Sequence, residues 1–146
     1  MTSPYAQTAS PAVWSNPSFQ AFSLLRVGFT VAPILFGLDK FLGLLAADWT
    51  VYLWSGAVSA LPGSAATIMA AVGVIEIVAG ILVAVRPRLG GYVVAGWLAG
   101  IIVNLLLVGD FFDIALRDFG LLLGALTLAR LATAFPHAGL SGEQRA

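Results

Sequence analysis

Hydrophobic positions divide the chain into four long apolar segments separated by shorter, more polar connections. A membrane-spanning helix needs about 20 largely apolar residues, and each segment meets that length. We predict an all-α fold, an integral membrane four-helix bundle at residues 21–135, with spans at about 21–45, 67–85, 90–108 and 114–135. Residues 1–20 and 136–146 are predicted to be polar tails.

The connections between the spans predict how the bundle is oriented. Arg86 and Arg88 lie in the second connection, whereas the first and third contain Asp48, Asp110 and Asp113 and neither Lys nor Arg. Because positive residues stay on the cytoplasmic side, both termini are predicted to be cytoplasmic. We also expect Asp113 to cap the last span by accepting its first N–H groups.

The first connection is the longest and carries Trp49, Tyr52 and Trp54. Trp and Tyr concentrate where a membrane meets water. These residues therefore predict an aromatic belt, on a short interfacial helix.

Composition supports a membrane protein and excludes several kinds of chemistry. Hydrophobic residues make up 60% of the chain and charged residues 10%, against about 25% charged in soluble domains. The net charge of zero gives no electrostatic basis for binding nucleic acid. With no cysteine, one histidine and two methionines, the sequence predicts no metal site, no intrinsic cofactor and no catalytic nucleophile.

Charged residues inside the spans are the candidate functional residues. Each would cost about 2.5–3.5 kcal/mol at the centre of a membrane helix, so we expect them to be paired. The seven are Arg26, Asp39, Lys40, Glu76, Arg117, Asp118 and Arg130. A rise of about 1.5 Å per residue separates them into two layers.

The inner layer contains Arg26, Glu76 and Arg130. Glu76 is the deepest, and Arg26 is its best partner by depth and sign, with Arg130 second. Two interpretations stay open. The pair is purely structural, or it handles protons or binds a polar headgroup, since ionisable residues inside membranes often mark such pathways.

The outer layer contains Asp39 and Lys40 near the end of the first span, Arg117 and Asp118 near the start of the fourth, and Asn104 on the third. Crossed pairs, Asp39 with Arg117 and Lys40 with Asp118, would neutralise the four charges. Alternatively, all four reach the outer interface and only fix the helix ends.

Small residues predict where the helices touch, because glycine lets two backbones approach closely. On the second span, two glycines flank Glu76 on one face and form a notch for a neighbouring helix or a ligand. The predicted packing glycines are Gly37, Gly73, Gly80, Gly96, Gly100, Gly120 and Gly124.

Three stretches together resemble the DoxX-like family of small four-helix bacterial membrane proteins. They are LLRVGFTVAPILFGLDKF, VGVIEIVAGILVAV and IALRDFGLLLGALTLARLA. The resemblance covers roughly residues 24–131. The matching positions are Arg26, Gly37, Lys40, Glu76, Gly80, Arg117 and Asp118.

The resemblance implies a bacterial inner-membrane location and an association with quinone-linked redox complexes. Because the chain lacks a ligand set for an electron carrier, it favours an accessory or anchoring subunit over an independent oxidoreductase. Its partners would be the lipid bilayer and other membrane subunits. One alternative is a separate protein that binds quinone or lipid in the Arg26 and Glu76 pocket. Another is a small proton-coupled carrier.

Overall fold

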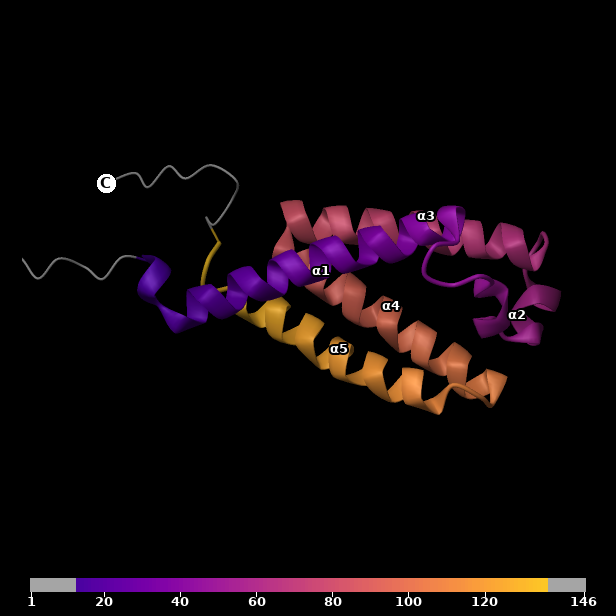
Figure 1. The fold of residues 1–146 in the computed structure, drawn as a ribbon. Coiled ribbons are helices and arrows are strands. Elements are labelled where there is room, and N and C mark those ends of the chain that lie inside the picture. Colours follow the sequence, from indigo (N-terminus) through magenta and orange to yellow (C-terminus); the bar gives the residue numbers. More distant parts are fainter. Residues whose placement is uncertain (1–12, 137–146) are drawn as a thin grey trace, which may run out of the picture.

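The computed structural model describes residues 13–136, which are mostly helical and contain no β-strand (Figure 1). After a 3-10 turn, η1 (Val13–Ser15), helix α1 (Pro17–Leu42) begins at Pro17 rather than at residue 21. Asn16 caps it by accepting the N–H of Ser18 at 2.9 Å, and proline suits the first position because its missing N–H has no helical partner. Gly43, in the left-handed conformation with φ 64°, ends it at Leu42.

Residues 43–64, which we call the strap, connect α1 to the next long helix. They contain η2 (Trp49–Tyr52) and α2 (Ser55–Ala60). Short helices therefore do occur in the aromatic connection. Helix α3 (Ala65–Val85) follows, and the hydroxyl of Ser64 caps it by accepting the N–H of Thr67 at 3.2 Å.

Only Arg86 separates α3 from α4 (Pro87–Val108), which ends at Gly109 with φ 84°. Helix α5 (Phe112–Leu131) completes the described chain. The prediction that Asp113 caps this helix is wrong. The cap is Phe111, which has φ 61° and makes no side-chain capping bond, while Asp113 lies in the first turn, where its charge still favours the helix dipole.

Helix α1 packs mainly along α3, and α4 packs mainly along α5 (Figure 1). Glycines allow the first contact: a Cβ on Gly37 would lie 2.5 Å from the carbonyl oxygen of Gly73, and one on Gly80 would lie 2.7 Å from that of Thr30. Gly91 does the same for α4 and α5, because its Cβ would lie 2.8 Å from the carbonyl oxygen of Ala125.

The other predicted packing glycines behave differently. A Cβ on Gly124 would approach the ring of Phe29 on α1, at 3.2 Å. A Cβ added to Gly96, Gly100 or Gly120 would have no other atom within 4 Å. The prediction that these three pack within the bundle is therefore wrong, because no described helix of this chain covers them.

The apolar core lies toward the end of the bundle at which α3 turns into α4. It combines residues from all four long helices, including Phe22, Val83, Leu98 and Leu128. Large apolar side chains also cover the outer faces of these helices. Such extensive apolar exposure is unusual for a soluble protein and ordinary for one whose surroundings are lipid.

Three helices are long and apolar enough to cross a membrane: α1, α3 and α4. Helix α5 has sufficient length but is too polar, because Asp113, Arg117, Asp118 and Arg130 fall within its 20 residues. The described structure therefore supports a membrane protein with three apolar candidate spans.

Candidate functional site

Lys40 of α1 and Glu76 of α3 form a buried ion pair. Their Nζ and Oε2 atoms are 2.7 Å apart, and the two side chains are 4% and 11% exposed. Lys40 lies beside Gly73, because a Cβ added to Gly73 would be 3.2 Å from the Cβ of Lys40. Its long side chain reaches one turn further along α3 to the carboxylate. The glycine thus brings the α1 backbone close enough for the pair to form.

The predicted partner of Glu76 was Arg26, and this is wrong. The Arg26 guanidinium donates a hydrogen bond to the carbonyl of Ala84 and lies over the Phe22 ring. Ala84 is eight residues from Glu76, which is about 12 Å along a helix. Arg26 therefore belongs to the end of the bundle near the α3–α4 turn.

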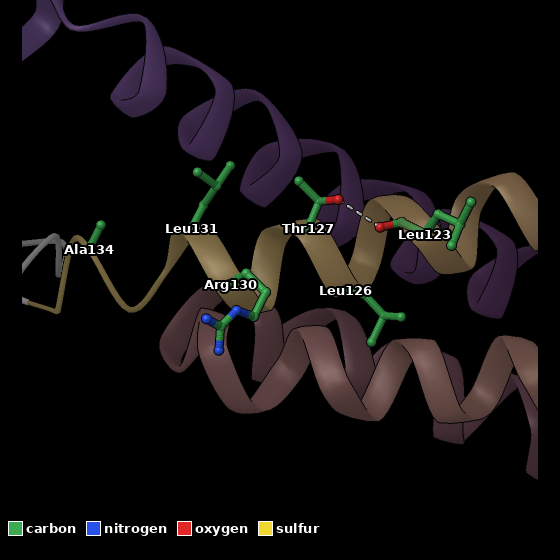
Figure 2. A pocket seen from close by; sticks show the side chains of 6 residues that line it. All are labelled: Leu123, Leu126, Thr127, Arg130, Leu131 and Ala134. Carbon is green, nitrogen blue, oxygen red and sulfur yellow. Dashed lines mark hydrogen bonds between the residues drawn. The ribbon is translucent and has the colours of Figure 1, made fainter.

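Arg130 is not part of a common site with Glu76 either. It is exposed on α5 and lines an open hollow of about 490 Å³ with Leu123, Leu126, Thr127, Leu131 and Ala134. In Figure 2, Arg130 and Leu126 project from one side of α5, and the Thr127 hydroxyl bonds the Leu123 carbonyl at 2.8 Å. Arg26, Glu76 and Arg130, predicted to form one inner layer, therefore lie in three separate environments.

Asp39 fixes the strap instead of pairing with Arg117, which corrects the first crossed pair. Its Oδ1 accepts the N–H groups of Leu44 at 2.7 Å and Leu45 at 2.8 Å. Its Oδ2 accepts the N–H of Ala46 at 3.2 Å and the indole N–H of Trp49 at 2.9 Å. Four donors satisfy this carboxylate, which is only 3% exposed.

The second crossed pair, Lys40 with Asp118, is also wrong. Asp118 accepts from its neighbour Arg117 at 3.2 Å, with the aspartate side chain 7% exposed and the arginine 62% exposed. Asp118 nevertheless lies near enough to Glu76 for its negative charge to act on that carboxylate. It therefore brings a second acidic group from α5 toward the Lys40–Glu76 pair.

Two tryptophans complete the site, and neither was assigned to it from the sequence. Lys40 Nζ lies 4.1 Å from the centroid of the Trp49 ring, a cation–π contact that brings the strap over the pair. The indole N–H of Trp97 on α4 approaches Glu76 but is buried without completing a standard hydrogen bond. A tryptophan in the middle of an apolar span was the available signal, since its N–H needs a partner when buried.

Asn104, predicted to join the outer charges, instead holds the strap against α4. Its Oδ1 accepts the N–H of Trp54 at 3.0 Å, and its Nδ2 donates to the carbonyl of Tyr52 at 2.6 Å. Asp39 and Asn104 therefore fasten the strap to two different helices.

The site combines one ammonium, two carboxylates and one indole donor from the four long helices. These groups can hold a proton or orient a polar ligand. Among residues 13–136, no cluster of His, Asp or Glu has the arrangement of a metal site. No protein-family model, curated protein or solved structure matches the chain.

Proposed function

We propose that the protein is an integral membrane subunit that anchors or stabilises a larger redox or respiratory complex in the bacterial inner membrane. The observation that carries the proposal is one face of α4, around Gly96 and Gly100, that no described part of the chain covers. Gly96, Gly100, Val103 and Leu107 follow one another at helical spacing, and all are exposed. Glycines with open space around them let a helix of another subunit approach closely. The resemblance to DoxX-like proteins supplies the expectation of a quinone-linked partner.

The proposal includes a fourth span. Helix α5 has 20 residues, about 30 Å, which matches the thickness of the hydrocarbon core. Its charges are compatible with a membrane because Asp118 is buried and paired and because Arg130 lies near the helix end, from which it can reach the interface.

Topology can be tested directly. With four spans and Arg86 and Arg88 on the cytoplasmic side, both termini are cytoplasmic. Reporter fusions after position 137, which lies outside the described residues, and at Ser64 should then report opposite sides. If both report the same side, the fourth span does not exist.

The docking face can be tested by purification in mild detergent. Leucine at both Gly96 and Gly100 should abolish co-purification of membrane subunits, identified by mass spectrometry, while the chain still folds. Gly28→Leu is the matched control, because a Cβ at this exposed α1 glycine would also meet nothing within 4 Å. Partners retained by the double variant, or lost equally with Gly28→Leu, would contradict docking on α4.

A second candidate function is binding of a quinone or lipid headgroup beside Glu76. It is favoured by the buried Trp97 N–H, which points toward Glu76 without completing a standard hydrogen bond among residues 13–136 and could donate to a carbonyl or hydroxyl oxygen of a ligand there. Trp97→Phe keeps an aromatic ring and removes this donor. If the second function holds, the variant should lose a co-purifying quinone or lipid and keep its protein partners.

A further inference from the structure

A hollow of about 580 Å³ lies where α3 turns into α4, against the end of α5. Its polar lining includes Arg26, Arg86 and Arg88, and no described carboxylate contributes to it. Val85, Leu89 and Phe135 provide apolar walls. The hollow therefore combines concentrated positive charge with a surface that suits hydrocarbon.

The position of the hollow relative to a membrane follows from the helices it joins. Helices α3 and α4 are both candidate spans, and Arg86 alone connects them. A connection between two consecutive spans must lie at a face of the bilayer. The arginines are thus at the depth of lipid headgroups, whichever side of the membrane that is.

Two further features favour an anion. Helix α4 begins at Pro87, and no side chain caps this end. The N–H groups of Arg88 and Leu89 therefore have no acceptor within the helix, and they form the positive end of its dipole. In addition, the ion pairs found among residues 13–136 involve neither Arg86 nor Arg88. Both guanidiniums are exposed and can offer paired N–H donors to phosphate oxygens.

We propose that this hollow binds the phosphate of an anionic phospholipid, with Arg86 and Arg88 contacting the phosphate and the acyl chains lying along Val85 and Leu89. Arg26 already donates to the Ala84 carbonyl, so it fixes the wall and contributes charge. The apolar walls select a lipid over free phosphate, because phosphate alone would leave them uncovered. This site is independent of the docking face on α4.

The test uses the full chain in mild detergent and phosphatidylglycerol as the probe. Native mass spectrometry measures lipid binding in competition with phosphatidylcholine, and the thermal unfolding midpoint is followed as lipid is added. A basic residue near a membrane surface contributes about 1 kcal/mol toward anionic lipid, or about fivefold in affinity. The double variant Arg86→Gln/Arg88→Gln should therefore bind phosphatidylglycerol about 25-fold more weakly.

Arg130→Gln is the matched control, since Arg130 lies near the same end of the bundle and outside the hollow. It should bind phosphatidylglycerol as the unchanged chain does. Equal weakening in the control would show diffuse surface charge and overturn the site. Equal stabilisation by inorganic phosphate would overturn a lipid as the ligand. If the double variant does not fold, the competition measured on the unchanged chain still tests the proposal. An unchanged chain that binds phosphatidylglycerol no better than phosphatidylcholine would overturn it.

Discussion

The Nζ of Lys40 lies 2.7 Å from the Oε2 of Glu76, near the middle of α3, so the carboxylate is neutralised by α1. Removing one member of a buried ion pair leaves an uncompensated charge, whereas removing both is often nearly neutral. Pairs of this kind can therefore be recognised by how their substitutions combine.

We expect Lys40→Met and Glu76→Gln each to lower the free energy of unfolding in detergent. The loss would be about 3–5 kcal/mol in a soluble protein, and we expect a smaller one here because the unfolded chain in a membrane finds other partners. The double variant should recover part of it. Thermal or denaturant unfolding of all four proteins measures the coupling.

Arg26→Gln provides the control for this pair. Its effect should simply add to that of Glu76→Gln, because Arg26 bonds Ala84 instead. Strong coupling of Glu76 to Arg26, and none to Lys40, would contradict the observed pairing.

The glycine contacts between α1 and α3 give a second prediction. A Cβ on Gly37 would lie 2.5 Å from a backbone oxygen, which cannot move without shifting α3. Gly37→Ala should therefore cost about 1–3 kcal/mol of stability, the usual range for overpacking. Gly28→Ala, where a Cβ meets nothing, should be neutral or stabilise by up to about 1 kcal/mol through helix propensity. Equal unfolding midpoints for the two variants would contradict this packing.

The apolar runs made the long helices predictable, because each needs only length and hydrophobicity to be recognised. The pairing of Glu76 was not predictable from depth alone. The hydrophobic pattern places the end of the first span at Leu45, at the outer surface of the membrane. In the structure α1 ends at Leu42, beside the middle of α3, and the strap follows it.

The register of α1 on α3 was nonetheless present in the sequence as Gly37 and Gly73. Matching these two glycines places Lys40 within one turn of Glu76. The roles of Asp39 and Asn104 could not be inferred, because they bind backbone groups of the strap. Such bonds depend on how the strap folds back, which hydrophobic periodicity does not encode.

Acidification should loosen η2 through Asp48. The hydroxyl and backbone N–H of Thr50 bond its carboxylate at 2.6 and 2.8 Å and hold its pKa below the ordinary value of 3.8. Because the folded pKa is the lower one, this stabilisation is present above pH 3.8 and is lost as the pH falls through the folded pKa.

Thr50→Val should raise the pKa of Asp48 toward its ordinary value, since the hydroxyl is the largest cause of the depression. An NMR titration of the Asp48 carboxyl in micelles measures the change. Thr127→Val, which removes a hydroxyl bonded to the Leu123 carbonyl, should leave the Asp48 titration unchanged. An unaltered Asp48 titration in Thr50→Val would show that the hydroxyl bond is absent in solution.

Asp39→Asn should release the strap from α1 while preserving the size of the side chain. The amide nitrogen of asparagine cannot accept, so whichever oxygen it replaces, two of the four donors lose their acceptor. Hydrogen bonds to charged groups contribute about 1.5–3 kcal/mol each, so amide exchange at the freed positions should accelerate at least about tenfold. Hydrogen exchange at Leu44, Leu45, Ala46 and the Trp49 indole measures this directly.

Asp48→Asn is the control, because it disturbs only the cap of η2 and should leave exchange at residues 44–46 unchanged. Protected amides there in Asp39→Asn would mean that the strap is held by Asn104 and by apolar packing alone.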